Sequence, residues 1–178
     1  IPILLLLFGS QQAKASHLYA TEITYRCLGN NQYIVQLEAF QDCGGIAAPT
    51  LASIQMVSSC AGTQNISLPQ ISVTDITPVC PGGTSPCLTN GYGTSHIIYS
   101  DTITLVSCND WVLSYTNCCR GTNVVNLVNS FSSIYTHVTL DNSSTCNNAA
   151  LSNNQKANSI SNIQNGVGFL VKLVSKVV

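Results

Sequence analysis

The nine cysteines of this 178-residue chain limit what it can fold into more than any other feature. They are spread along the chain and do not form the close CxxC pairs of a structural zinc site, whose ligands come in pairs separated by a short loop. A disulfide framework accounts for this spacing better, and such frameworks form in exported proteins. The nine candidate disulfide cysteines are Cys27, Cys43, Cys60, Cys80, Cys87, Cys108, Cys118, Cys119 and Cys146.

An odd number of cysteines leaves one thiol over, either free or joined to another chain. The sequence does not fix the pairing, because eight cysteines already allow many connectivities. The easiest local bridge is Cys80–Cys87, since two prolines and two glycines fold the loop between them back on itself. Each bridge typically contributes about 2–4 kcal/mol, against a net domain stability of about 5–15 kcal/mol.

The first residues indicate export. Residues 1–8 (IPILLLLF) are apolar, residues 9–12 are polar, and residues 13–15 form the small-x-small sequence Ala-Lys-Ala. This is the layout of a signal peptide without its basic first region, so we expect residues 1–15 to be a signal-peptide remnant whose cleavage leaves Ser16 first. The alternative is a buried strand or helix start. The run is too short for a bilayer span, which needs about 20 residues.

Few side chains carry charge, and this excludes several classes of partner. Charged residues make up 7% of the chain and the net charge is −1, while Ser, Thr, Asn and Gln supply the polarity. A nucleic-acid binder needs a dense basic patch to neutralise phosphates, and a protein held on anionic lipid needs a polybasic segment. We therefore expect no nucleic-acid partner, and no segment of the chain predicts a membrane span.

Alternation of polar and apolar residues with period two dominates the chain and predicts β-strands. Residues 22–27 and 33–40 form a predicted hairpin around turn residues 28–32. The other predicted strands are 51–57, 66–76 with a break at Pro69, 96–106, 111–118 and 134–140. No window of eleven or more residues between 16 and 154 has a helical apolar period. The expected fold is an all-β, antiparallel, Ig-like β-sandwich of about seven to nine strands over residues 16–146, disulfide-stapled, with Greek-key connections.

The character of the chain changes after Cys146. Residues 147–165 contain seven asparagines and few large apolar groups, which is typical of a linker or a long surface loop. Residues 166–178 are apolar again, with two lysines, and are too short to span a membrane. They are either the first strand of a following domain or a tail.

Three blocks of sequence resemble a known group of proteins. They are residues 17–33 (HLYATEITYRCLGNNQY), 40–43 (FQDC) and 113–129 (LSYTNCCRGTNVVNLVN). Together they resemble the opening domain of large secreted surface proteins of Bacteroidota, which carry Ig-like or PKD-type repeats and often a C-terminal gliding-motility or type IX secretion sorting domain. The resemblance implies an adhesin-like, non-enzymatic cell-surface module whose partners include neighbouring repeat domains of the same chain.

This chain departs from that group at several positions. Ala20 and Thr21 stand where the group commonly has two glycines before the glutamate. Gln41 replaces a usual arginine, Gly121 a usual asparagine, and Ser130 a usual proline. The resemblance supplies a location and a role rather than a ligand.

The adjacent pair Cys118 and Cys119 is the most tempting catalytic candidate. Neighbouring residues of a strand point to opposite faces, so we expect each cysteine to bridge a different partner. The alternatives are a vicinal disulfide, or a thiolate nucleophile or metal pair that needs a nearby base or cation. Arg120 is adjacent, and His137 could be the base. His137, however, has the parity opposite to the apolar residues of its predicted strand, which favours a solvent-facing side chain.

Other polar residues give no recognised site. His17, Glu22 and Asp42 do not have the sequence spacing of a metal site, and His96 begins a predicted strand. Glu22 and Glu38 are the only glutamates, and both alternate outward on predicted strands. The aspartates do not form an EF-hand loop, although a loop Ca²⁺ ion stays an alternative. Nucleophile-elbow, phosphate-loop and zinc-protease motifs do not occur in the sequence, so we expect no cofactor, no metal and no catalytic residues.

Aromatic residues offer one candidate ligand contact. Trp111, Tyr115 and Tyr25 could stack on sugars, yet a tryptophan on a central strand near a cysteine fits the core of a sandwich better. Tyr92, between Gly91 and Gly93 in a predicted loop, is the better candidate for contact with a ligand, because loops at the ends of sandwiches carry function.

Three functions follow from the sequence. The first is a non-enzymatic, secreted or cell-surface structural or adhesion module of a larger protein, whose partner is a surface glycan or a protein ligand. The second is a carbohydrate-binding β-sandwich module. The third is a cysteine-dependent enzyme that uses Cys119, or one that uses a carboxylate pair.

Overall fold

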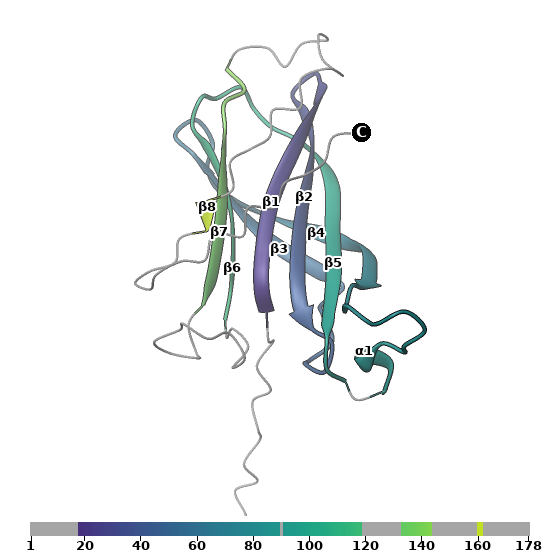
Figure 1. The fold of residues 1–178 in the computed structure, drawn as a ribbon. Helices are drawn as coiled ribbons and strands as arrows, with labels where there is room; N and C mark the ends of the chain where they lie inside the picture. Colours follow the sequence, from purple (N-terminus) through teal and green to yellow (C-terminus); the bar gives the residue numbers. More distant parts are fainter. Residues whose placement is uncertain (1–17, 90, 119–132, 144–159, 162–178) are drawn as a thin grey trace, which may run out of the picture.

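In the computed structural model, the described part of the chain is all-β with one short helix (Figure 1). The structure describes residues 18–89, 91–118, 133–143 and 160–161. The elements are β1 (Leu18–Gly29), β2 (Gln32–Asp42), β3 (Leu51–Ser58), β4 (Gly62–Asp75), α1 (Pro86–Thr89), β5 (Thr94–Thr104), β6 (Trp111–Asn117), β7 (Ile134–Leu140) and β8 (Ile160–Ser161). The predicted signal-peptide remnant 1–15 and the apolar tail 166–178 lie outside the described residues.

Strand formation follows the alternation in the sequence. In β3, Ala52, Ile54 and Met56 are buried and the residues between them are exposed. Because successive side chains of a strand point to opposite faces, this pattern gives β3 one face on the core and one in solvent. The same alternation places Ile134, Val138 and other even-numbered residues of β7 in the core.

The β1–β2 hairpin has a turn made of residues that tolerate a left-handed backbone. Gly29, Asn30 and Asn31 have φ angles of 94°, 52° and 59°. Glycine adopts positive φ without a steric penalty, and asparagine does so more readily than other residues. The turn brings Cys27 of β1 opposite Tyr33 of β2, so the hairpin that the sequence predicts is confirmed.

The strands have Greek-key connections. Their hydrogen-bonded order is β1-β2-β5-β4-β3-β6-β7-β8, and every pairing is antiparallel. β3, β4 and β5 are consecutive neighbours, and β2, which precedes β3 in the chain, lies beside β5 at the other side of this group, which is the Greek-key arrangement. The prediction of an antiparallel β-sandwich is therefore confirmed. β8 lies within the predicted linker 147–165 and pairs with β7.

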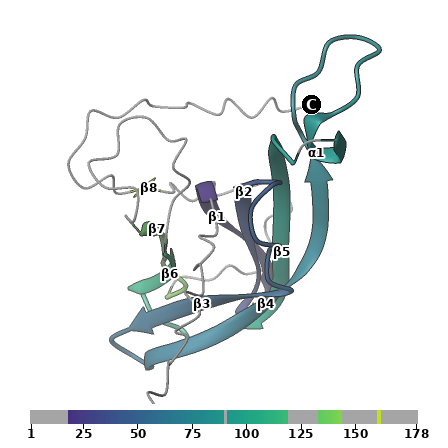
Figure 2. The same cartoon turned by 90° about the horizontal axis from the view of Figure 1, so that it is seen from below.

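One strand belongs to both layers of the sandwich. The first part of β4 pairs with β3 and its second part pairs with β5, so β4 curves from one layer to the other (Figure 2).

The expected break at Pro69 is wrong, because β4 runs through this residue. Pro69 is opposite Leu51 at the end of the β3 ladder, and Gln70 donates from its backbone N–H to the carbonyl of Thr50 at 2.9 Å. Proline has no backbone N–H to donate. It is tolerated here because a strand needs no backbone donor at the residue where it leaves its ladder partner.

The core fills the space between the two layers. The layer of β1, β2 and β5 contributes Ile23, Tyr33, Val35, Leu37, Ala39, Ile97 and Tyr99. The layer of β3, β6, β7 and the first part of β4 contributes Ala52, Ile54, Met56, Leu68, Trp111, Leu113, Tyr115, Ile134, Val138 and Leu140. Trp111 is 1% exposed, so its predicted place in the core is confirmed.

A pair of threonines joins the two layers at the side away from β4. The described residues show no ladder pairing between β1 and β7, yet the hydroxyls of Thr21 and Thr136 lie 2.7 Å apart. The hydroxyl of Thr136 also donates to the carbonyl oxygen of Thr21 at 3.1 Å. The Thr21 hydroxyl must then be the donor in the contact between the hydroxyls. Both residues are buried, so this pair closes the seam with polar groups that satisfy each other.

The sequence did not predict the helix α1. Proline is favoured in the first turn of a helix, and here Pro86 begins one that the Ser85 hydroxyl caps by accepting a hydrogen bond from the backbone N–H of Cys87 at 3.2 Å. Among the described residues, no helix has both the length and the apolar character needed to cross a membrane.

Candidate functional site

Two disulfides lie at opposite ends of the sandwich. Cys43, directly after β2, is bonded to Cys87 in α1, with a sequence separation of 44. Cys60, in the turn between β3 and β4, is bonded to Cys108, between β5 and β6, with a separation of 48. The end of β5 that leads to Cys108 lies far from α1 (Figure 1). The predicted disulfide framework is confirmed for these four cysteines.

The predicted local bridge Cys80–Cys87 is wrong. Cys87 is bonded to Cys43, and Cys80 is free and exposed. The sheet explains the pairing, because the backbone N–H of Cys43 donates to the carbonyl of Gly93 at 3.3 Å, just before β5. This register brings Cys43 to the segment that contains α1. Cys80 lies instead in a separate turn, in which the backbone N–H of Gly83 donates to the carbonyl oxygen of Cys80 at 2.9 Å.

Two further cysteines of the framework are oxidised. Cys27 in β1 and Cys118 after β6 are both disulfide-bonded. Cys118 is therefore not a thiolate, which contradicts the nucleophile and metal-pair alternatives for this residue. Cys119 and Cys146 lie outside the described residues, and their roles stay predictions.

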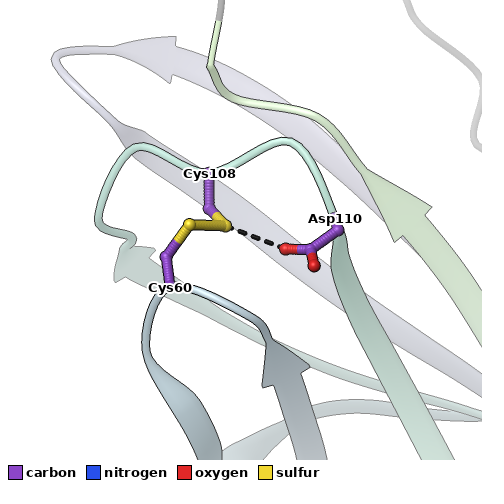
Figure 3. Close-up of side chains that lie close together, drawn as sticks. All are labelled: Cys60, Cys108 and Asp110. Atoms are coloured by element: carbon purple, nitrogen blue, oxygen red, sulfur yellow. Dashed lines mark hydrogen bonds between the residues drawn. A yellow bond between two sulfur atoms is a disulfide. The ribbon is translucent and has the colours of Figure 1, made fainter.

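The candidate site is the group formed by Cys60, Cys108 and Asp110 (Figure 3). Their sulfur and carboxylate ligand atoms lie within 4.8 Å of one another. Asp110 Oδ1 is 2.8 Å from Cys108 Sγ. A sulfur in a disulfide carries no proton, so we read this contact as a close approach of a carboxylate oxygen to the bonded sulfur. Cys108 is 3% exposed, whereas Cys60 and Asp110 are exposed.

Backbone contacts hold this group in place. The backbone N–H of Ser59 donates to both carboxylate oxygens of Asp110, at 3.2 and 3.1 Å. The backbone N–H of Cys108 donates to Oδ1 of Asn142 at 2.7 Å, and the Asn142 N–H donates to the Cys108 carbonyl at 2.9 Å. Asn142 is 2% exposed and follows β7. Three connections between strands are thereby fixed to one another around the disulfide.

The chemistry of this group depends on the state of its sulfurs. Thiolates and carboxylates are metal ligands, but the thiolate is the ligand form of cysteine, and both sulfurs are bonded to each other here. In the oxidised protein the group is thus a disulfide with an adjacent negative charge. The sequence names both cysteines as disulfide candidates and offers Asp110 only among the aspartates that could serve a loop Ca²⁺ ion. It does not predict that Asp110 lies beside the disulfide, for which the one signal is its position two residues after Cys108.

Tyr92, the predicted ligand contact, lies at the α1 end of the sandwich. Its side chain is 68% exposed, and its neighbours Gly91 and Gly93 have φ angles of 72° and 151°. A side chain at Gly93 would collide with Thr77 and with the sulfur of Cys87, so the loop depends on this glycine for its close approach to the disulfide. The exposure leaves Tyr92 accessible, and contact with a ligand stays a prediction.

The other aromatic candidates do not form a surface platform. Trp111 is buried, and its indole N–H donates to the carbonyl of Val106 at 3.1 Å. Tyr115 is 7% exposed. Tyr25 is half-buried and meets Tyr33 edge to face, with ring centroids 6.1 Å apart. Sugar stacking on Trp111 and Tyr115 is therefore excluded in this fold.

Ionisable side chains gather on the outer face of β1, β2 and β5. Glu22 lies directly opposite Glu38 across the β1–β2 ladder. Glu38 accepts a hydrogen bond from the Gln36 amide at 2.9 Å and pairs with His96 Nε2 at 2.8 Å. The His96 ring stacks on Phe40, with centroids 4.7 Å apart and planes 7° from parallel. Both glutamates face outward, as the sequence predicts.

The remaining polar candidates are separated from one another. Asp42 is buried at the end of β2, where it accepts a hydrogen bond from the Gly44 N–H at 3.0 Å. His17 lies outside the described residues. His137 has the predicted outward parity and lies against Tyr135, with ring centroids 5.4 Å apart. Its Nδ1 is buried and has no hydrogen-bond partner among the residues that the structure describes.

Burial and hydrogen bonding shift the pKa values of several side chains. Burial is the main reason that the pKa values of four tyrosines lie above the ordinary value, and these are Tyr25, Tyr33, Tyr99 and Tyr115. Hydrogen bonds from Ser143 lower the pKa of Asp141, and those from Ser85 and then Thr77 lower the pKa of Asp75. These shifts belong to groups outside the Cys60–Cys108–Asp110 site.

No protein family model, curated protein or solved structure matches this chain.

Proposed function

We propose that this chain is a non-enzymatic structural or adhesion module of a larger protein exported to a cell surface. The observation that supports it most is the pair of disulfides at opposite ends of the sandwich, with sequence separations of 44 and 48. Stable disulfides are typical of proteins in oxidising compartments and rare in reducing ones. A surface covered mainly by neutral polar side chains is compatible with such a location.

The positions of the disulfides support a scaffold role. Cys43–Cys87 fixes the loops at the α1 end, and Cys60–Cys108 fixes the loops at the other end. Loops held on a rigid framework are the usual place for binding residues in a β-sandwich. The oxidised cysteines brace these loops, and the exposed residues between them form the binding surface.

Labelling of intact cells tests this proposal. Cys80 is exposed and free, so it is a handle for a maleimide reagent that does not cross membranes. Cells that produce the full chain should be labelled without lysis, and a Cys80→Ser chain should be labelled much less. The same cells should lose attachment to their substratum when the domain is deleted. Labelling only after lysis, or unchanged attachment, contradicts the proposal.

A carbohydrate-binding module is the second candidate, and the exposure of Tyr92 favours it. An aromatic ring that is 68% exposed between two glycines is available to stack on the apolar face of a sugar. A glycan array probed with the wild type and with Tyr92→Ala should show binding that the substitution abolishes. Tyr135→Ala is the matched control, because this residue is also an exposed tyrosine. Equal binding by all three proteins, or none, contradicts this candidate.

A further inference from the structure

We infer that the carboxylate of Asp110 protects the Cys60–Cys108 disulfide from reduction by thiols. Asp110 Oδ1 lies 2.8 Å from Cys108 Sγ. Figure 3 shows this oxygen on the far side of Cys108 Sγ from the sulfur of Cys60. The backbone N–H of Ser59, the residue before Cys60, binds both carboxylate oxygens and keeps the charge at this position.

Thiol reduction of a disulfide follows a fixed geometry. A thiolate approaches one sulfur along the line of the S–S bond, forms a new S–S bond to it, and expels the other sulfur as a thiolate. A dithiol reductant then closes its own disulfide and releases the second cysteine, and both protein thiolates take protons from water. The two possible first steps are attack on Cys108 and attack on Cys60.

Attack on Cys108 is blocked. Its residue is 3% exposed, so a reagent has little access to the sulfur. The side from which a thiolate would enter, opposite Cys60, is the side that the Asp110 oxygen occupies (Figure 3). An incoming thiolate would meet both the atom and its negative charge.

Attack on Cys60 is slow because the sulfur that leaves is that of Cys108. Cys60 is exposed and accessible, but attack there expels Cys108 as a thiolate. That negative charge would develop beside Asp110, and an aspartate side chain is itself negatively charged at neutral pH. Like charges a few ångströms apart disfavour the charged form, and a disfavoured thiolate is a poor leaving group.

The two described disulfides differ in how close a hydroxyl lies to their sulfurs. At Cys60–Cys108 the Ser59 hydroxyl is 3.9 Å from Cys108 Sγ and 4.0 Å from Cys60 Sγ. The oxygen that contacts Cys87 Sγ is the neutral hydroxyl of Thr77, at 3.1 Å. A hydroxyl can donate a hydrogen bond to a developing thiolate, whereas a carboxylate can only accept one. We therefore expect Cys43–Cys87 to be reduced faster than Cys60–Cys108 in the same molecule.

The test follows reduction of Cys60–Cys108 and Cys43–Cys87 in a Cys80→Ser chain, which removes thiol exchange by Cys80. Dithiothreitol is the probe, samples are quenched with an alkylating reagent, and mass spectrometry measures the modified cysteines over time. We expect Asp110→Asn to accelerate reduction of Cys60–Cys108 roughly tenfold, with Cys43–Cys87 unchanged. Asp101→Asn is the matched control, because Asp101 is also exposed and its carboxylate also accepts a backbone N–H.

A faster reduction of the Asp110→Asn protein could come from the lost charge or from a loosened turn. Measurements at different ionic strengths distinguish these two causes. Salt screens exposed charges, so the difference between wild type and Asp110→Asn should narrow in 1 M salt, where the Debye length is about 3 Å. Asp110→Ser gives a second uncharged variant if the asparagine chain does not fold. Equal rates in wild type and both variants, equal acceleration of both disulfides, or a difference that salt does not change would overturn the inference. These outcomes concern the disulfide alone, so they are independent of any adhesion or glycan result.

Discussion

Removal of the Cys60–Cys108 disulfide is the most direct perturbation of this fold. The crosslink closes a loop with a sequence separation of 48. In the chain-entropy account, a loop of this length restricts the unfolded state by about 4 kcal/mol, and native-state effects reduce the measured value. We therefore expect Cys60→Ala/Cys108→Ala to lower the free energy of unfolding by about 3–4 kcal/mol. Against a typical domain stability of about 5–15 kcal/mol, this loss is a large fraction of the margin.

Urea unfolding followed by fluorescence measures the effect. Trp111 is the single tryptophan of the chain and is 1% exposed, so its emission reports the integrity of the core. The urea concentration at the midpoint of unfolding should fall. The unfolding free energy should also depend more steeply on urea, because an unfolded chain without the crosslink exposes more surface. Both quantities come from the same curve.

The single substitution Cys80→Ala is the control. Cys80 is exposed and free, so its replacement should change the unfolding free energy by no more than about 0.5 kcal/mol. A loss below about 1 kcal/mol in the double variant, or a similar loss in the control, would refute the argument that this disulfide braces the sandwich.

Three further predictions follow from the described contacts. Thr136→Val should cost about 1–3 kcal/mol of unfolding free energy, because it leaves the buried polar groups of Thr21 without their partner, whereas Thr139→Val on the exposed face of the same strand should cost little. Stability should fall as the pH rises above about 10, because the folded state holds the proton of buried tyrosines more tightly than the unfolded state does. An alkaline titration that follows tyrosinate absorbance together with unfolding checks this for Tyr25, Tyr33, Tyr99 and Tyr115. Alkylation of the native protein should modify Cys80 and leave Cys43 and Cys87 unmodified, whereas a Cys80–Cys87 bridge would leave Cys43 as the modified residue of these three; peptide mapping by mass spectrometry distinguishes the two outcomes.

Local patterns in the sequence were sufficient to predict most strands and the fold class. The alternation in β3 and β7 is strict, and the side chains that alternate inward are the ones that form the core. The β1–β2 hairpin was predictable because Asn30 and Asn31 supply the turn chemistry. In these segments, the information that decides the structure lies within a few residues of the place where it acts.

The pairing of cysteines was not predictable in the same way. The short loop between Cys80 and Cys87 favours closure, but the register of β2 against β5 places Cys43 beside the α1 segment. Likewise, Pro69 reads locally as a break, yet β4 needs no backbone donor where it changes partners. Asp110 became a site residue because the β3–β4 turn returns to it. Each of these outcomes depends on residues that are distant in sequence.

The places where the sandwich is closed explain why its cysteines matter. β4 joins the layers on one side through continuous strand pairing, while the Thr21–Thr136 pair joins them on the other side. The two described disulfides close the ends. Surface ion pairs contribute little to stability, and a chain with 7% charged residues has few to offer. Unfolding of this protein should therefore respond weakly to salt and strongly to reductant, because covalent bonds supply the closure that charge does not.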